Sequence, residues 1–452
     1  MRKYFGTDGI RRIANTELTP NLVFRVAKAG AYILAKHSTH TPTILIGRDT
    51  RISGTLIESA MTAGFLSYGA NVKLLGVIPT PGAAYLTREL KADACVVISA
   101  SHNTFEFNGV KYFSNKGTKI PDNIEEEIEE IMDSEQLSAL TAVGEKIGVS
   151  ENAENYIEKY IEFFVNLFKD DFKDLPKDFC VGLDTANGAT YKIAEEVYKR
   201  LGINFKIINN NPDGLNINEN CGSTHMNNIS NFVKENKLSL GFAYDGDGDR
   251  CLAVDENGEI IDGDITMAIL ADYFKKNNEL KKDTLVATVM SNLGLTKFAK
   301  NQEIELMQTK VGDRYVLEEM LKNGYNLGGE QSGHIIFLDY NPTGDGILTS
   351  LMLLKAMKNK KASEAKKVVN IYPQILLNAK VINEKKFDYD KDPDIKSAIE
   401  KLEKEFSENG RVLIRTSGTE PIVRVMIEGE NQEYITKKAR ELVDLIEEKL
   451  GK

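Results

Sequence analysis

The sequence predicts three successive α/β units followed by a smaller α+β domain. Short, uniformly apolar, β-branched runs alternate with helix-periodic segments, and this pattern restarts near residues 43, 180 and 284. After about residue 369 the pattern changes to alternating strands and charged amphipathic helices, which favours a sheet with antiparallel pairs. The length of 452 residues suits several domains at a typical size of about 150 residues each. We place the domains at 1–150, 151–255, 256–368 and 369–452.

The first unit begins with a strand at 43–47, whose apolar residues lack the alternation of a half-exposed strand. A helix at 55–68, a strand at 71–77, a helix near 83–90 and a strand at 94–99 follow. The acidic run at 122–130 is typical of a helix with a solvated face.

The same alternation predicts the elements of the other units. The second unit should hold strands at 180–184, 205–208, 240–244 and 250–255, with helices at 189–201 and 227–236. The third should hold strands at 284–290 and 304–308, with helices at 293–300 and 313–322. The last domain should hold strands at 375–382, 411–415 and 423–428, with helices at 394–407 and 434–450.

Composition excludes several classes of protein. With 42% hydrophobic and 27% charged residues, the chain is neither disordered nor collagen-like. The 57 basic and 67 acidic residues give a net charge of −10, which argues against a general nucleic-acid binder. No apolar run reaches the 18 or so residues of a membrane helix, and no signal peptide is recognised at the N-terminus. The four cysteines form no C-x-x-C pair, so we expect no zinc or disulfide framework and a cytoplasmic location.

The strongest chemical signal is a loop of alternating aspartates and glycines after the strand at 240–244. Asp245, Asp247 and Asp249 would repel one another unless a cation lay between them, and oxygen ligands favour Mg²⁺, Ca²⁺ or Mn²⁺. An EF-hand is excluded because Arg250 stands where that loop requires glycine. An exposed acidic turn is the simpler alternative.

A second signal follows the strand at 94–99, in the run Ser101-His102-Asn103. Ligands bind at the carboxyl ends of strands in open α/β sheets, which makes Ser101 a candidate nucleophile or phosphate carrier. A capped turn would look the same, and the chain has no G-x-S-x-G elbow.

Three further turns carry residues that suit phosphates or sugars. The turn from Arg415 to Pro421, with Arg424 downstream, combines arginines, hydroxyls and a glycine, as a phosphate cradle requires, although a capped hairpin would look similar. The run Gly328–His334 displays Glu330, Ser332 and His334 between glycines. The run Phe5–Arg11 places an arginine after a glycine-rich turn.

Together and in this order, the five segments resemble the α-D-phosphohexomutase superfamily over essentially the whole chain. The runs Gly329–His334 and Val311–Val316 favour the members that act on glucosamine phosphates. The alternatives are a member that acts on mannose or glucose phosphates, and a catalytically silent binding protein with the same fold.

The resemblance implies four domains around a central cleft, three of them similar α/β domains with mixed sheets and the fourth a smaller α+β domain. It implies a phosphoserine at Ser101, which with Asp245, Asp247 and Asp249 would hold one Mg²⁺. Glu330, Ser332 and His334 would contact the sugar. The phosphate that is not reacting would be held by a larger set of residues, namely Arg415, Ser417, Gly418, Thr419 and Arg424.

The implied reaction moves a phosphoryl group from Ser101 to O1 of glucosamine 6-phosphate and then recovers the 6-phosphoryl from the 1,6-bisphosphate, which yields glucosamine 1-phosphate for UDP-N-acetylglucosamine synthesis. His102 lies beside the nucleophile, and Arg250 and Arg11 would add positive charge. Lys111 is the first candidate to move the hydroxyl proton and His334 the second, while a purely structural lysine remains open.

The same resemblance implies a phosphosugar partner, a bisphosphate activator such as glucosamine 1,6-bisphosphate, and an activating kinase or autophosphorylation. No nucleic acid or membrane is expected to bind, and a homodimer stays open. Thr104, Phe107 and Arg12 depart from the family's usual pattern beside the catalytic residues.

Overall fold

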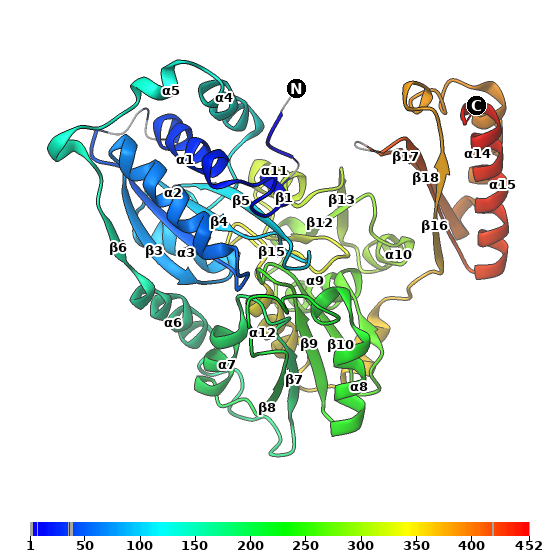
Figure 1. The fold of residues 1–452 in the computed structure, drawn as a ribbon. Helices are drawn as coiled ribbons and strands as arrows, with labels where there is room; N and C mark the ends of the chain where they lie inside the picture. The colour runs from blue at the N-terminus through cyan, green and yellow to red at the C-terminus, as the bar shows by residue number, and fades with distance from the viewer. Residues whose placement is uncertain (1–2, 7, 35, 37–38, 418–419, 452) are drawn as a thin grey trace. The chain divides into compact units, whose positions relative to one another are not determined.

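The computed structural model describes residues 3–6, 8–34, 36, 39–417 and 420–451. Its contacts divide the chain into two compact units. The first holds Met1–Met290 and Ile304–Val368, and the second holds Ser291–Glu303 and Val369–Lys452. Three mixed sheets with their helices lie in the first unit and an antiparallel sheet in the second (Figure 1), which confirms the predicted fold class.

The first sheet has the strand order β1-β5-β4-β2-β3-β6. Its parallel centre consists of the strands predicted from their apolar runs, whereas β5 pairs antiparallel with both β4 and β1. The strands are β1 (Ile10–Ile13), β2 (Thr43–Arg48), β3 (Asn71–Val77), β4 (Ala94–Ile98), β5 (Phe107–Ser114) and β6 (Ser150–Asn152). The helices of this part are α1 (Pro20–Leu34), α2 (Gly54–Tyr68), α3 (Thr80–Glu89), α4 (Asp122–Met132), α5 (Gln136–Ala139) and α6 (Ile157–Phe168).

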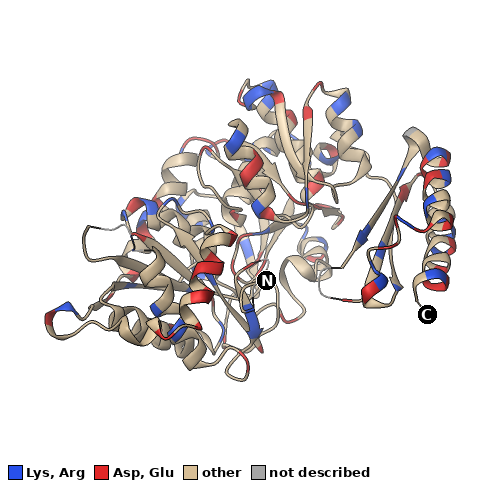
Figure 2. Ribbon diagram, turned by 90° about the horizontal axis from the view of Figure 1, so that it is seen from above, with Lys and Arg blue, Asp and Glu red and all other residues tan. Residues whose placement is uncertain are grey.

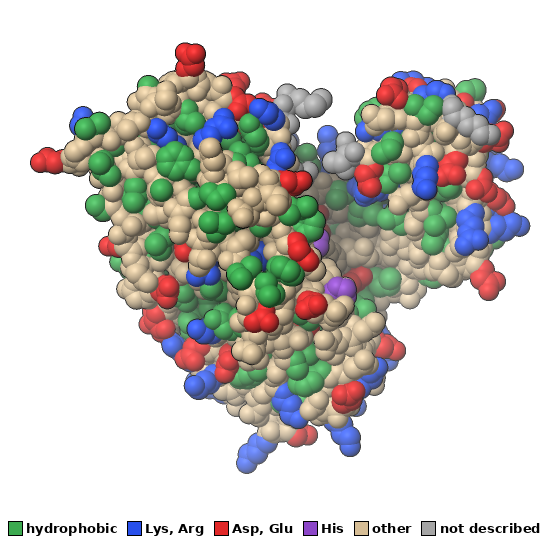
Figure 3. Space-filling view, viewed as in Figure 1, with side chains coloured by type: hydrophobic (Ala, Val, Ile, Leu, Met, Phe, Trp, Pro, Cys, Tyr) green, Lys and Arg blue, Asp and Glu red, His purple; other side chains and the backbone are tan. Residues whose placement is uncertain are grey.

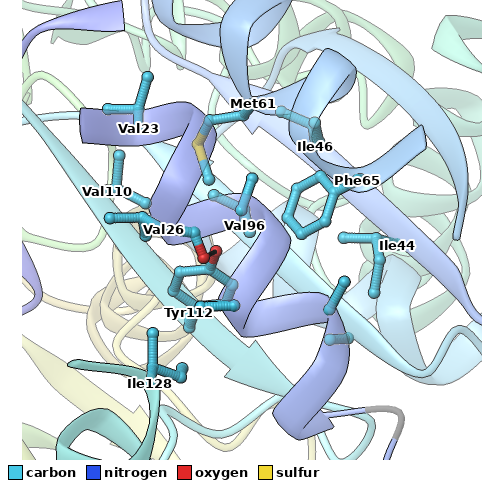
Figure 4. Close-up of a cluster of buried hydrophobic side chains, with 14 of the residues drawn as sticks. Val23, Val26, Ile44, Ile46, Met61, Phe65, Val96, Val110, Tyr112 and Ile128 are labelled. Atoms are coloured by element: carbon cyan, nitrogen blue, oxygen red, sulfur yellow. Dashed lines mark hydrogen bonds between the residues drawn. The ribbon is translucent and has the colours of Figure 1, made fainter. Parts of the chain in front are cut away.

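Helices α1, α2 and α4 cover one face of this sheet and bury the side chains that alternate strand residues direct toward them. Figure 4 shows Ile44, Ile46 and Val96 from the sheet packed against Met61 and Phe65 of α2. Truncating a buried phenylalanine in such a core costs about 3–5 kcal/mol. This packing joins β2 and β4 to α2 through a continuous apolar core.

The second and third sheets follow the same plan, with a parallel centre and an antiparallel edge. The second has the order β11-β10-β9-β7-β8 and the third β13-β12-β14-β15. Their strands are β7 (Val181–Asp184), β8 (Phe205–Ile208), β9 (Leu240–Tyr244), β10 (Cys251–Asp255), β11 (Ile260–Ile261), β12 (Thr284–Thr288), β13 (Glu305–Thr309), β14 (Leu327–Gly329) and β15 (Ile335–Phe337). The remaining helices of the first unit are α7 (Tyr191–Arg200), α8 (Asn227–Asn236), α9 (Gly263–Lys276), α11 (Asp313–Asn323), α12 (Gly346–Met357) and α13 (Ala362–Ala365).

The second unit is built on the antiparallel order β16-β18-β17. Its strands are β16 (Gln374–Lys380), β17 (Gly410–Thr416) and β18 (Ile422–Gly429), and its helices are α10 (Leu293–Asn301), α14 (Pro393–Phe406) and α15 (Gln432–Leu450). Helix α10 was expected with the third α/β unit, but its contacts group it with this one.

The acidic helix α4 was expected to present a solvated face. Glu126 and Glu130 are exposed, as expected, whereas Glu125 and Glu129 of the same helix are buried. Glu129 accepts the backbone N–H groups of Lys3, Tyr4 and Phe5 at 2.6–2.7 Å. An exposed carboxylate would leave those amides to water, so this glutamate ties the N-terminal segment to the first sheet's helical layer.

Charge and apolar surface are dispersed elsewhere. Figure 2 shows both signs of charge interspersed over the helices of both units, and the face in Figure 3 carries apolar side chains scattered among charged ones. Among the described residues, no helix has the length and apolar character to cross a membrane, because the most apolar one, α12, has only 12 residues.

Candidate active site

Every predicted site loop except the N-terminal one joins two antiparallel neighbours in a sheet. Ser101 lies between β4 and β5, the aspartates between β9 and β10, Glu330 between β14 and β15, and the Arg415 turn between β17 and β18. In the three mixed sheets, the loop therefore leaves the carboxyl end of a parallel strand and returns along an antiparallel one. This arrangement holds both ends of each loop in a sheet.

Ser101 and the aspartate loop meet within the first unit. The hydroxyl of Ser101 donates to Oδ2 of Asp245 at 2.7 Å, and both residues are buried. Ser101 has a φ of 51°, in the left-handed region that few non-glycine residues adopt. Strain of this kind is typical of functional loops that their surroundings hold in place.

The three aspartates form one carboxylate cluster, as predicted. Their ligand oxygens all lie within 4.8 Å of one another and all three residues are buried. Oδ1 of Asp247 and Oδ1 of Asp249 are buried and accept no hydrogen bond from any described residue. Burial, together with the charges of Asp249 and Asp247, raises the pKa of Asp245 well above its ordinary value. Unpaired buried carboxylate oxygens that converge are the donor set of a hard divalent cation, so the residues fit Mg²⁺.

Lys111 lies beneath the cluster and is buried. Its Nζ is 2.9 Å from Oδ2 of Asp247 and 3.0 Å from Oδ2 of Asp8. Burial alone would lower the pKa of Lys111, but the carboxylates of Asp247 and Asp8 raise it above the ordinary lysine value. The geometry therefore favours a permanently charged lysine over one that readily accepts a proton.

Two arginines and a histidine adjoin Ser101. Arg250 donates its backbone N–H to Oδ1 of Asp245 at 3.2 Å, and its Nη1 is 3.4 Å from Nδ1 of His102. Arg11 donates to Oδ1 of Asn103 at 3.1 Å. Burial, and then the charges of Arg250 and Arg11, lower the pKa of His102 to about 4, and its Nδ1 lies 3.4 Å from Oγ of Ser101. His102 is therefore neutral at neutral pH.

His334 has a partner at each ring nitrogen. Nδ1 is 3.5 Å from Oδ2 of Asp249, and the backbone N–H of Gly344 donates to Nε2 at 2.9 Å. Burial alone would lower the pKa of His334, but Asp249 and Asp313 raise it. The bond from Gly344 requires an unprotonated Nε2, which places the ring proton on Nδ1, facing Asp249.

A polar cavity of about 660 Å³ opens in front of these residues. Of the predicted site residues, it is lined by Arg11, Asp249, Arg250, Glu330 and His334. Ser101, Lys111, Asp245 and Asp247 do not line it, and neither does Ser332, whose buried hydroxyl has no hydrogen-bond partner among the described residues. Glu330 accepts the N–H of Gly312 at 3.1 Å, and burial raises its pKa.

Sequence reasoning missed part of this cavity. Nζ of Lys119 bridges Asp8 and Asp313, which lies 2.6 Å away. Burial alone would raise the pKa of Asp8, but Lys111, Lys119 and Arg11 lower it well below its ordinary value. Asp8 and Asp313 lie inside the runs Phe5–Arg11 and Val311–Val316, whereas no motif marks Lys119. Arg12, one of the residues that departs from the family's pattern, also lines the cavity.

In the second unit the predicted arginines are cross-strand neighbours. Arg415 of β17 pairs in register with Arg424 of β18. Burial and the charge of Arg424 lower the pKa of Arg415. Like charges directly opposite each other destabilise a sheet, so this pair suits an anion site. Oγ of Ser417 accepts the N–H of Glu420 at 3.1 Å, and Gly418 and Thr419 lie outside the described residues.

Four family models match the chain in succession. They are described as phosphoglucomutase/phosphomannomutase alpha/beta/alpha domain I at residues 2–139, domain II at 155–258, domain III at 262–375 and the C-terminal domain at 376–445.

Similar proteins and structures span the full length. The chain is 54% identical to the phosphoglucosamine mutase of Ruminiclostridium cellulolyticum and 52% identical to that of Acetivibrio thermocellus, over 100% of both chains in each case. A phosphoglucomutase/phosphomannomutase family protein from Burkholderia thailandensis has a similar structure, with a TM-score of 0.79, 22% identity and coverage of 98% and 97%. The Aspergillus fumigatus N-acetylphosphoglucosamine mutase, solved with GlcNAc-6P and magnesium, has a TM-score of 0.66, 18% identity and coverage of 99% and 96%.

Proposed function

The chain belongs to the phosphoglucosamine mutases of the phosphoglucomutase/phosphomannomutase family, and from this premise we propose how its residues divide the chemistry. The reaction is the interconversion of glucosamine 6-phosphate and glucosamine 1-phosphate, an isomerisation of a phosphosugar. We assign the phosphoryl carrier to Ser101. The observation that supports this assignment is the 2.7 Å hydrogen bond from its hydroxyl to a buried cluster of three carboxylates.

In the first half-reaction, O1 of glucosamine 6-phosphate forms a bond to the phosphorus on Ser101 while the Oγ–P bond breaks. O1 loses its proton, and Oγ becomes the serine hydroxyl. The resulting 1,6-bisphosphate turns over, and Oγ then attacks the 6-phosphorus, so that O6 leaves as a hydroxyl and glucosamine 1-phosphate forms. Little covalent work falls to the protein, because positioning and charge neutralisation dominate phosphoryl transfer.

Asp245, Asp247 and Asp249, with an oxygen of phosphorylated Ser101, would hold one Mg²⁺ per chain. When bound, this ion neutralises charge on the transferring phosphoryl group. Lys111 keeps Asp247 and Asp8 paired and adds fixed positive charge beneath them. Arg250 and Arg11 contribute further charge from the cavity wall.

We assign the proton transfer at Ser101 to His102. The sequence named Lys111 first and His334 second for this role, but Nζ of Lys111 is paired with two carboxylates, and the ring nitrogens of His334 face Asp249 and the N–H of Gly344. The ring of His102 lies 3.4 Å from Oγ, close enough to exchange a proton after a small movement.

Glu330, on the cavity wall, is proposed to bind the hydroxyl or ammonium groups of the sugar, and Ser332 and His334 to support it. Arg415, Ser417 and Arg424, with Gly418 and Thr419, are proposed to bind the phosphate that is not reacting. The in-register arginine pair supports this role, since a bound phosphate would relieve its repulsion.

Several broader expectations remain proposals. We keep the domain limits at 1–150, 151–255, 256–368 and 369–452, although β6 crosses the first limit and β11, which pairs in the second sheet, lies wholly beyond the second. A bisphosphate such as glucosamine 1,6-bisphosphate would keep Ser101 phosphorylated, after a kinase or autophosphorylation supplies the first phosphoryl group. The four free cysteines support a reducing cytoplasm.

The test is a rate comparison on glucosamine, mannose and glucose 6-phosphates, with Mg²⁺ and a trace of bisphosphate. We expect the highest kcat/KM on the glucosamine compound and no activity in Ser101→Ala that remains folded. Preference for mannose or glucose phosphate would refute the substrate, and an active Ser101→Ala would refute the carrier.

A further inference from the structure

Behind the serine loop lies an arginine that no motif marked. Arg51 follows β2, and its side chain is fully buried. Its Nε donates to Oδ2 of Asp49 at 2.9 Å, and the same oxygen accepts the hydroxyl of Ser99 at 2.5 Å. The charge of Arg51 is thus neutralised locally, which leaves its remaining N–H groups as hydrogen-bond donors.

Those N–H groups all bind the backbone of the serine loop. Nη2 donates to the carbonyls of Ser101 at 2.9 Å and Asn103 at 2.7 Å. Nη1 donates to the carbonyls of Thr104 and Phe107, the latter at 3.1 Å. One guanidinium therefore binds four carbonyls between the end of β4 and the first residue of β5. Thr104 and Phe107, two of the three departures from the family's pattern, contribute backbone atoms to this arrangement.

A second side chain reaches two of the same carbonyls from the neighbouring sheet. Nδ2 of Asn218 donates to the carbonyls of Ser101 and Asn103, each at 2.8 Å, and Asn218 is buried. It follows β8 in the sequence, in the part of the chain that also carries the aspartate loop. Gly246 of that loop approaches so closely that a Cβ there would lie 2.6 Å from both the Ser101 carbonyl oxygen and Nδ2 of Asn218.

We propose that Arg51 and Asn218 are positioning residues that hold the phosphoserine loop in register with the aspartate loop. The proposal rests on the assignment of Ser101 as the phosphoryl carrier. With four of its carbonyls bound by these side chains, the loop presents the hydroxyl of Ser101 to Oδ2 of Asp245 at 2.7 Å. The left-handed φ of Ser101 is held by the same bonds, so loosening them lets the loop relax away from the metal ligands.

The alternative is that both residues stabilise the fold and nothing more. The two roles differ in what they predict for a protein that is still folded. If the role is structural only, the substitution lowers the Tm but leaves kcat unchanged at temperatures well below the Tm. A positioning role lowers kcat in fully folded protein and leaves the KM for the sugar phosphate nearly unchanged, since neither residue lines the cavity.

The experiment compares Arg51→Lys and Asn218→Gly with the parent enzyme. Lysine keeps the charge but lacks the planar fork that spans four carbonyls. Glycine removes the amide without strain, because Asn218 has a φ of 58°. The matched control is Arg88→Lys, since Arg88 donates to the carbonyl of Tyr340 and to Oδ1 of Asn341, away from Ser101.

We expect kcat to fall about 100-fold in Arg51→Lys, as a misplacement of about 1 Å can cause, and about 10-fold or more in Asn218→Gly, which removes fewer of the bonds. The KM for glucosamine 6-phosphate should stay within about twofold, and Arg88→Lys should keep the parent's kcat. Should Arg51→Lys fail to fold, Asn218→Gly decides alone.

The proposal would be overturned if folded Asn218→Gly, or both variants, had the same kcat as the parent enzyme. Ser101→Ala, run in the same assay, separates this failure from failure of the proposed carrier. If Ser101→Ala is inactive while Arg51→Lys and Asn218→Gly are fully active, only the positioning role is refuted. An active Ser101→Ala refutes the carrier itself.

Discussion

Gly246 is the point at which the aspartate loop and the serine loop come closest, and Gly246→Ala should separate them. The added Cβ would lie 2.6 Å from the Ser101 carbonyl oxygen and from Nδ2 of Asn218, and 2.9 Å from Cδ1 of Ile217. Ordinary contacts begin at 3.4 Å. The loops must therefore move apart by about 0.8 Å, the difference between 3.4 Å and 2.6 Å. This displacement is close to the ~1 Å at which positioning fails.

Two measurable effects follow from this displacement. Overpacking in a tight site costs about 1–3 kcal/mol of unfolding free energy, which lowers the Tm by several degrees. Misalignment of the phosphoryl group with its metal ligands costs up to about 100-fold in kcat. The assay is the coupled rate of glucosamine 1-phosphate formation at 25 °C, with thermal unfolding followed on the same samples.

Gly324→Ala is the matched control for a loss of stability alone. Gly324 ends helix α11 with a φ of 71°, and its Cβ would meet no atom within 4 Å. The left-handed strain costs about 1–2 kcal/mol, so the Tm of Gly324→Ala should fall about as far as that of Gly246→Ala. Its kcat should stay at the parent value. If Gly246→Ala retains kcat within about twofold of the parent, the close approach of the two loops does not matter for the reaction, and the reasoning is refuted.

Four further predictions address the charges of the site and the fold. Lys111→Met should lower kcat at least 100-fold and the unfolding free energy by about 3–5 kcal/mol, because it leaves buried carboxylates unpaired; a kcat near the parent's would contradict this. Arg424→Ala should raise the KM for glucosamine 6-phosphate about 10- to 100-fold, without loss in urea unfolding, since Arg415 loses a like-charged neighbour. Mg²⁺ added to metal-free protein should raise the Tm, and Asp247→Asn should abolish that rise in the same thermal scan. Burial raises the pKa of Asp345 to about 6, so the folded protein binds this proton more tightly than the unfolded chain does. The unfolding free energy should therefore fall as the pH rises from about 4 to 6. Asp345→Asn should flatten that part of the pH dependence in urea unfolding, and an unchanged slope would contradict the prediction.

The predicted strands with continuous apolar runs are present, because burial on both faces leaves a signal in the sequence. The strand at 94–99 and the strand at 240–244 correspond to β4 and β9. The antiparallel strand β5, which lies between β1 and β4, was not predicted, because Phe107–Ser114 mixes polar and apolar residues without strict alternation. That strand nevertheless explains why the serine loop is held at both ends.

In the candidate site, too, some residues could be predicted from the sequence and others could not. Ser101 and the three aspartates could be predicted, since phosphate and cation chemistry restrict the residue types that a loop can carry. Arg51 and Asn218 could not, because they act on backbone carbonyls, which every sequence possesses. Glu129 was misjudged for a related reason: its partners are backbone amides of a segment more than a hundred residues away.

The central claim is that Ser101 carries the phosphoryl group that the sugar receives, and a single-turnover experiment tests it most directly. Protein phosphorylated with a bisphosphate is freed of the excess, mixed with glucosamine 6-phosphate and Mg²⁺, and followed by intact-mass and peptide mass spectrometry. This mechanism predicts a form about 80 Da heavier, with the added mass on the peptide that contains Ser101. That phosphoryl group leaves Ser101 as glucosamine 1,6-bisphosphate forms and is replaced from O6 as glucosamine 1-phosphate forms, so an isotopically labelled phosphoryl group placed on Ser101 should appear at O1 of the product. A phosphoryl group that maps to another residue, or a labelled one that stays on Ser101 while glucosamine 1-phosphate accumulates, would contradict it.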